Sequence, residues 1–203
     1  MQPVRTLLAA SSPLAISLLL AGCASPGQTV PDSLWSSAPE SLQERNPNDI
    51  AVLPVVDETR GAASPRKDAP PLGVFRKAAY EEVLSRRYAA LSLPFVDRSV
   101  RVVEATSPGY GACGEDAALR IVLQRFDDSD LVRDPSVRIA AECYLHDGKT
   151  GEVIWSSRAF RNISLRVEAK TLHDPALLRE IAADRFVRYA LGNLPVREIR
   201  AGG

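Results

Sequence analysis

The apolar and polar residues of the chain alternate in stretches of strand-like and helix-like spacing. Residues 50–56 form a continuous, mostly β-branched apolar run of strand length, which fits a strand buried on both faces. Pro54 predicts a bend or an edge position within that strand. Residues 72–91 carry apolar side chains at helical spacing, which predicts an amphipathic helix. Residues 94–103 are predicted as a second strand.

The second half of the chain predicts three consecutive strands and a last helix. The three strands cover residues 119–126, 137–146 and 153–165. Asp147-Gly148 between the last two is a strong hairpin signal, and Asp174-Pro175 supplies the N-cap and first residue of a C-terminal helix. These elements predict an α+β (α/β-like) fold, with one mixed sheet of about five strands, a helix after the first strand and a C-terminal helix packed on the sheet.

The N-terminus has the pattern of a cleaved leader. Arg5 precedes an apolar run over residues 7–20, which is too short for a lasting membrane span. The run ends in the small residues Ala21 and Gly22, followed by Cys23, which is the order of a signal peptide with a lipobox. We expect cleavage between Gly22 and Cys23 and the attachment of acyl chains such as palmitate to Cys23. Several acyl chains on one residue hold a protein firmly at a membrane.

The expected leader divides the chain into three parts. Residues 1–22 are the signal peptide. Residues 23–48, rich in Ser, Pro, Gln, Glu and Asn, are expected to be a flexible tether behind the lipidated cysteine, and residues 49–203 a single α+β periplasmic domain. Ala24 and Ser25 follow the cysteine, and the absence of an aspartate there favours the outer membrane. The protein would then lie in the cell envelope, facing the periplasm.

The charge of the mature chain excludes one class of partner. Removing Arg5 from 25 basic and 25 acidic residues leaves 24 and 25, a net charge near −1. No polybasic patch supports binding to a polyanionic partner, whether nucleic acid or anionic lipid.

A glycine pattern raises the possibility of a nucleotide cofactor. Residues 109–114 match the spacing of a dinucleotide-binding loop, and Asp134 follows at a suitable distance for a ribose. Against this interpretation, residues 119–126 fit a strand as well as a helix, no phosphate-facing N-cap is present, and exported proteins rarely meet NAD. We therefore expect no cofactor.

The remaining reactive residues do not assemble into a catalytic motif. His146 and His173 lack the second ligand at helix or hairpin spacing that a metal site needs, so no metal is expected. Cys113 lies beside Glu115 and Asp116, which raise a thiol pKa and disfavour an active thiolate. No Gly-x-Ser-x-Gly elbow is present, and the chain is not expected to be an enzyme.

Cys113 and Cys143 are the only cysteines after Cys23, and the periplasm is oxidising, so a disulfide between them is a candidate. If the turn near residues 130–131 centres the hairpin, Cys143 lies opposite Leu119. Six residues then separate Leu119 from Cys113, too far for a bond unless the loop doubles back.

A run of motifs between residues 48 and 165 resembles a known family. It joins the strand at residues 50–54, an amphipathic helix, a second strand, residues 115–123 and the turn at 147–156. In this order it is similar to a family of bacterial outer-membrane lipoproteins whose fold resembles the penicillin-binding-protein activator lipoprotein B, the curli-secretion lipoprotein and the N-terminal domain of the Tol-system propeller protein.

The most specific part of the resemblance is a turn motif made by four residues: Asp147, Thr150, Gly151 and Trp155. It implies a closed hairpin with the tryptophan packed on the sheet. The chain departs from the family after the second strand, where a loop at residues 107–114 is expected in place of a helix.

The resemblance implies a non-catalytic envelope protein. We expect a lipid-anchored adaptor or assembly component that contacts another envelope protein or assembles with itself, as the curli-secretion relative does. The alternative is a ligand-binding or transport-auxiliary lipoprotein, which would need a concave apolar pocket. The expected partner-binding residues are Arg60, Arg66 and Lys67 in the irregular loop at residues 57–71, with Trp35 in the tether as the other choice.

The lipobox generates the first prediction. Replacing Cys23 by serine removes the thiol that accepts lipid, so Cys23→Ser should leave an unprocessed or soluble precursor. Metabolic labelling with a palmitate analogue checks this, and a wild-type chain that takes up no label would contradict the expected anchor.

Overall fold

The computed structural model describes residues 32–37, 40–59, 69–103 and 110–198. Its centre is a seven-stranded mixed sheet in the order β1-β7-β6-β5-β2-β4, with β3 paired to β5. The strands are β1 (Ser33–Ser37), β2 (Asp49–Val52), β3 (Val56–Asp57), β4 (Ala89–Ala90), β5 (Ala117–Asp127), β6 (Ser136–Asp147) and β7 (Val153–Ser164). The helices are α1 (Glu40–Arg45), α2 (Leu72–Ser85), α3 (Leu93–Val103) and α4 (Pro175–Ala190), with a short 3-10 helix, η2 (Glu168–Lys170).

The predicted α+β class is confirmed, and the sheet has more strands than the five expected. The long strands β5, β6 and β7 form the predicted antiparallel meander. Strands β2 and β3 run parallel to β5, and β4 runs parallel to β2. Among the described residues, no helix is long and apolar enough to cross a membrane.

The first predicted strand is divided at Pro54. Residues Val52 and Val56 are four apart, yet they pair with Leu119 and Val122, which are three apart. The extra residue makes a bulge, because proline cannot donate to the ladder. Pro54 itself is exposed.

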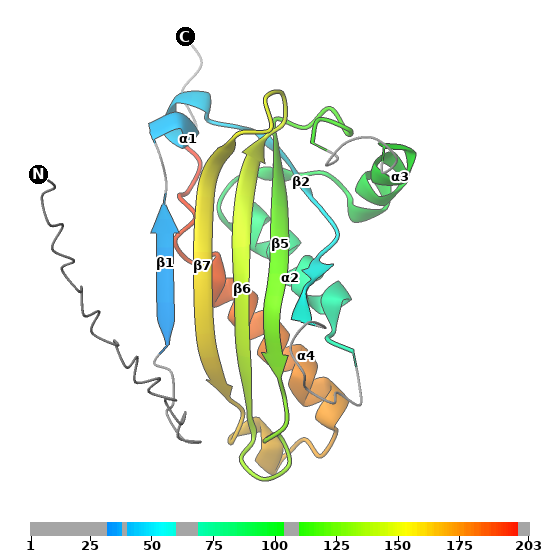
Figure 1. Ribbon diagram of the computed structural model, residues 1–203, viewed down its shortest axis with the longest axis vertical. Helices are drawn as coiled ribbons and strands as arrows, with labels where there is room; N and C mark the ends of the chain where they lie inside the picture. The colour runs from blue at the N-terminus through cyan, green and yellow to red at the C-terminus, as the bar shows by residue number, and fades with distance from the viewer. Residues whose placement is uncertain (1–31, 38–39, 60–68, 104–109, 199–203) are drawn as a thin grey trace, which may run out of the picture. The chain divides into compact units, whose positions relative to one another are not determined.

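Helices α2 and α4 cover one face of the sheet, as Figure 1 shows behind β5, β6 and β7. Along β6 the inward residues alternate with outward ones, which is the period of a strand buried on one face. The inward residues of β6 are Val137, Ile139, Ala141, Cys143 and Leu145. Phe75 of α2 meets Phe126 of β5 and Phe186 of α4 edge to face, with ring centroids 6.1 and 6.2 Å apart.

The last helix begins as predicted. Asp174 accepts a hydrogen bond from the backbone N–H of Ala176 at 2.8 Å, and Pro175 occupies the first turn. The buried Ser157 hydroxyl of β7 donates to the Ala190 carbonyl at 2.8 Å, which ties the end of α4 to the sheet. Trp155 is fully buried beneath the helices, as the turn motif implied.

The predicted strand at residues 94–103 is wrong, because this segment is helix α3. Its β-branched residues favoured a strand, but Leu93, Val96 and Val100 recur at helical spacing and pack on β2 and β5. A helix therefore precedes residues 110–114, where a strand followed by a loop without a helix was expected. Helix α2 ends at Ser85, six residues earlier than predicted, and Arg87 follows with a left-handed backbone (φ 67°).

The predicted tether at residues 23–48 is wrong in its second half. Ser33–Ser37 pair antiparallel with β7, and Glu40–Arg45 form helix α1. Residues 23–31 lie outside the described part of the chain. Strand β1 therefore adds an edge to the sheet, and the segment between Cys23 and the folded domain is much shorter than expected.

The proposed disulfide does not form, since both cysteines are free. Cys143 lies in the cluster beneath α2 and α4, whereas Cys113 packs beside α3 in a second cluster with Val96 and Ala118. The sheet separates the two thiols. Burial raises the pKa of the Cys113 thiol, and Glu115 raises it further; burial raises that of Cys143 to about 12.

The β6–β7 turn is held by a close backbone contact. Gly148 donates to the Asp116 carbonyl at 2.8 Å, and a Cβ on Gly148 would lie 2.1 Å from the Glu115 carbonyl oxygen. The Glu115 carboxylate in turn accepts from the backbone N–H groups of Gly111 and Cys113, both at 2.8 Å. The described part of the glycine motif, residues 110–114, thus supports this turn and precedes strand β5, not the helix that a dinucleotide site needs.

This contact generates the second prediction. Gly148→Ala should destabilise the domain by roughly 1–3 kcal/mol, because backbone must move to admit the methyl group. Gly73→Ala in α2 is the matched control: its Cβ would meet nothing within 4 Å, so stability should stay equal or rise by up to ~1 kcal/mol. Urea unfolding of both variants checks this, and equal midpoints would contradict the close packing of the turn.

Candidate functional site: the open face of the sheet

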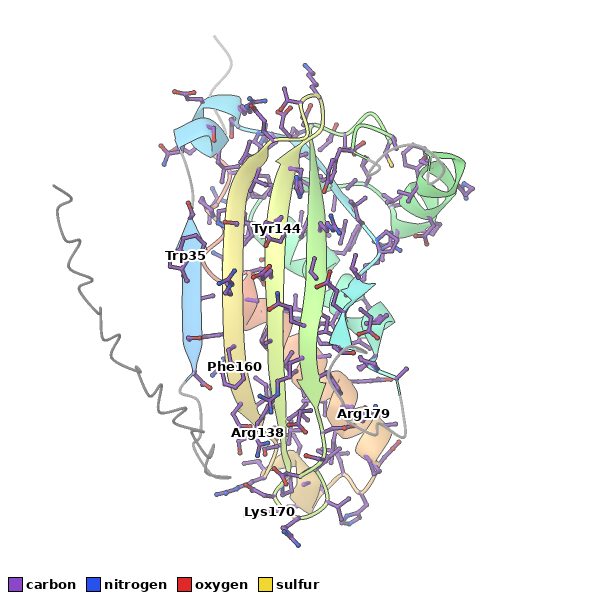
Figure 2. The ribbon with its side chains drawn as sticks, in the orientation of Figure 1. Trp35, Arg138, Tyr144, Phe160, Lys170 and Arg179 are labelled. Atoms are coloured by element: carbon purple, nitrogen blue, oxygen red, sulfur yellow. The ribbon has the colours of Figure 1, made fainter. Side chains whose placement is uncertain are left out.

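The face of the sheet opposite α2 and α4 is the candidate functional site, and we call it the open face. Helix α3 covers only its β2 side. The outward residues of β1, β5, β6 and β7 that form it are Trp35, Arg120, Gln124, Arg138, Ala140, Glu142, Tyr144, Ser156, Arg158, Phe160 and Asn162. Figure 2 looks onto this face, where Trp35, Tyr144, Phe160 and Arg138 are labelled.

The centre of the open face is a polar network around Glu142. Its carboxylate accepts a hydrogen bond from the Tyr144 hydroxyl at 2.5 Å and another from Arg158 Nε at 2.6 Å. Mainly because of the hydrogen bond from Tyr144, and with help from Arg158, the pKa of Glu142 lies below its usual 4.5. The same hydrogen bond raises the pKa of the Tyr144 phenol. The network orients Arg158, whose side chain remains 71% exposed.

Aromatic side chains flank this network. Trp35 lies directly opposite Arg158 in the register of β1 and β7, and 61% of its surface is exposed. Phe160 lies two residues further along β7, between Ser33 and Ala140, and is half-buried. Tryptophan, tyrosine and arginine are the residues that most often carry binding energy in protein interfaces. The open face combines all three across neighbouring strands.

The α3 end of the open face is closed by stacked rings. Tyr110 stacks on His146 with centroids 4.1 Å apart, and its hydroxyl lies 2.9 Å from His146 Nε2. Nδ1 of the same ring lies 3.0 Å from the Gly151 carbonyl, which only accepts, so the neutral ring carries its proton on Nδ1. Burial lowers the pKa of His146. Through these contacts His146 joins Tyr110 to the β6–β7 turn, so its role here is structural.

The structure describes few of the site residues predicted from sequence. Gly22, Cys23, Arg60, Arg66 and Lys67 lie outside the described residues. Trp35 is described, but it belongs to a strand of the sheet and not to a tether.

The ends of the predicted partner loop are fixed on both sides. Thr59 is buried, and the Ala69 carbonyl accepts from Arg179 Nη2 at 3.0 Å.

Sequence reasoning missed Glu142, Tyr144, Arg158 and Phe160. The alternation in residues 137–146 and 153–165 marks them as outward-facing positions. The alternation does not give the register in which the strands pair, and it is this register that brings the four side chains together.

Other kinds of site find little support in the described part of the chain. No group of three His, Cys, Asp or Glu residues lies close enough there to hold a metal ion. A hollow of about 80 Å³ is lined by residues of α1, Tyr88 and the chain around Pro195, whereas pockets for small molecules usually measure ~300–1,000 Å³.

The fold defines a class of small mixed-sheet domains, and solved structures share it. PelC from Paraburkholderia phytofirmans, solved as a dodecamer, matches with a TM-score of 0.51 and 11% identity over 82% of this chain and 99% of that one. This likeness shows the fold. No family model and no curated protein matches the sequence.

Two further structures match more loosely. Lipoprotein GNA1162 from Neisseria meningitidis has a TM-score of 0.47 and 17% identity, over 71% of this chain and 99% of that one. LpoB from E. coli has a TM-score of 0.42 and 12% identity, over 80% of this chain and 88% of that one. The fold shared with PelC agrees with the α+β fold predicted from the sequence.

The Glu142 network generates the third prediction. Tyr144→Phe removes the main cause of the lowered pKa, so the pKa of Glu142 should rise toward 4.5. A carboxylate whose folded pKa is lowered stabilises the protein above its unfolded pKa and loses that contribution as pH falls through the folded value. Tyr144→Phe should therefore weaken the dependence of stability on pH below about 4.5.

Carboxyl NMR titration measures the Glu142 pKa directly. Tyr80→Phe on α2 is the matched control, because no hydrogen bond joins Tyr80 to the network, and it should leave that pKa unchanged. An unaltered Glu142 titration in Tyr144→Phe would mean that the hydrogen bond does not hold in solution.

Proposed function

We propose that this chain is a lipid-anchored envelope protein that docks another envelope protein on the open face of its sheet. The anchor would be acyl chains on Cys23 after cleavage behind Gly22, at the periplasmic side of the outer membrane. The protein would act as a non-catalytic adaptor or assembly component.

The observation that carries the proposal is the exposure of Trp35 beside Arg158 and Phe160. A tryptophan that gained nothing from a partner would be expected to lie against the core, as Trp155 does. Here the indole is 61% exposed on the open face, beside the guanidinium of Arg158, which Glu142 already holds. A preorganised arginine loses less conformational entropy on binding than a free one.

The partner's chemistry follows from this surface. An open sheet face whose central charged network is flanked by aromatic side chains suits another folded protein better than a small molecule, which needs a concave site. The partner would present an apolar side chain to Trp35 and Phe160 and an acceptor to Arg158. A second copy of this chain is another possible occupant, and PelC crystallises as a dodecamer.

The loop at residues 60–68 is a further proposed contact. Arg60, Arg66 and Lys67 would add basic donors at its surface. Its deletion in the binding assay below separates its contribution from that of the open face.

The fourth prediction tests the docking surface. A photoreactive amino acid in place of Trp35 should crosslink one defined envelope protein in living cells, whereas the same group at Leu84 on α2, which is 45% exposed, should not. Trp35→Ala with Arg158→Ala should weaken recovery of that protein by roughly 30-fold, as expected for loss of an interface hot spot of ~2 kcal/mol.

Leu84→Ala is the control for that double variant and should leave recovery intact. Crosslinks between identical peptides would identify a second copy as the occupant. Equal crosslinking from Trp35 and Leu84, or full recovery with the double variant, would exclude the open face as the docking surface.

A further inference from the structure

Strand β1 fixes the point at which the chain enters the domain. Asp32 accepts the backbone N–H of Asn162 at 2.9 Å and pairs with Arg161 at 3.4 Å. In Figure 1, β1 begins at the end of the sheet where β7 ends and β6 begins. We call this the entry end, and it comprises the β5–β6 turn at residues 128–135 and the segment at residues 165–174.

The position of β1 limits how the domain lies on a membrane. Asp32 is nine steps along the chain from Cys23, and an extended chain covers ~3.3–3.6 Å per step, so the connection reaches about 30 Å at most. Strand β6 has 12 residues, which at ~3.3 Å each makes the sheet about 40 Å long. Asp32 lies beside Asn162, nine residues along β7 from Val153 at the β6–β7 turn. With lipid on Cys23, that turn could lie on the bilayer with the sheet upright only if the connection were almost fully extended, so the geometry favours the entry end as the end nearer the bilayer.

The entry end exposes apolar side chains. Val132 is 90% exposed and Val167 is 74% exposed. They belong to segments that lie side by side, because Leu165 donates its backbone N–H to the Pro135 carbonyl at 2.7 Å and Arg166 pairs with Asp134 at 3.0 Å. Two exposed valines on adjoining segments form a small apolar tip.

The charges of the entry end suit an anionic surface. Each acidic side chain of the entry end is already engaged, as is Asp127 beside it. The pairs are Asp127 with Arg125 and Arg138, Asp128 with Arg179, Asp130 with Arg138, Asp134 with Arg166, and Glu168 with Arg185, while Asp174 caps α4. Arg133 and Lys170 have no carboxylate partner among the described residues. Figure 2 shows Lys170 at the tip of this end.

We propose that the entry end rests on a phospholipid bilayer, with Val132 and Val167 at the boundary of headgroups and acyl chains and with Arg133 and Lys170 on anionic headgroups. The inference rests on the proposed anchor at Cys23. A lipid chain and a short apolar and basic surface together give a two-point attachment that sets orientation as well as location. The open face would then stand along the membrane normal, accessible from the side.

The test uses the full lipidated chain in vesicles of phosphatidylethanolamine and phosphatidylglycerol. An environment-sensitive fluorophore is attached at Val132→Cys in a Cys113→Ser background, where Cys143 stays buried. Brominated lipids should quench this probe roughly fivefold more than the same probe at Val153→Cys, an exposed position beside the β6–β7 turn. Equal quenching at the two positions would overturn the proposal.

Charge variants test the basic part of the surface. Arg133→Glu with Lys170→Glu should reduce the quenching of the Val132→Cys probe to the level of the Val153→Cys control. Lys149→Glu in the β6–β7 turn should change nothing. Unchanged quenching in the double variant would contradict the proposed contact of Arg133 and Lys170 with anionic headgroups.

Vesicle flotation separates this inference from the anchor. Protein that floats with the vesicles but carries an unquenched probe at position 132 overturns the bilayer contact and leaves the anchor standing. Protein that takes up no lipid and does not float overturns the proposed anchor, and the inference with it.

Discussion

The burial of only one face of the long antiparallel meander is the constraint on which this structure depends. Strands β5, β6 and β7 alternate apolar and polar side chains, and α2 and α4 cover the apolar side. Among the described residues, α3 is the one helix that packs on the other side, over β2, so most outward residues of the meander must be compatible with water. The outward positions are therefore free to carry Tyr144, Arg158 and Phe160, which a two-sided core would exclude.

The hairpin turn between β6 and β7 fixes the register in which these two strands pair, and so which side chains face the helices and which face outward. The contact of Gly148 with the Glu115 carbonyl brings the start of β5 against the turn and leaves no room for a side chain. A shift of one residue would move Tyr144 into the core and Leu145 into solvent. The same register places Glu142 opposite Arg158, so the stability of the turn and the geometry of the open face are linked.

Strand β1 connects location to interaction. It contributes Trp35 to the open face and sets the distance between the domain and the expected lipid on Cys23. Without β1, a longer flexible segment would join Cys23 to the folded domain, and the domain could take any orientation relative to the lipid. Pairing with β7 shortens the stretch between Cys23 and the folded domain and fixes the point at which the chain enters the sheet.

The sequence by itself determined the elements whose causes are local. The meander, the hairpin at Asp147-Gly148 and the cap at Asp174 follow from side-chain period and turn chemistry within a few residues. Tertiary contacts decided the rest: residues 93–103 became helix α3 because Val96 and Val100 could pack on β2, and Trp35 became part of a strand because β7 offered an unpaired edge. Pairing partners distant in the sequence leave no periodic signal, so the open face arises only when the sheet is assembled.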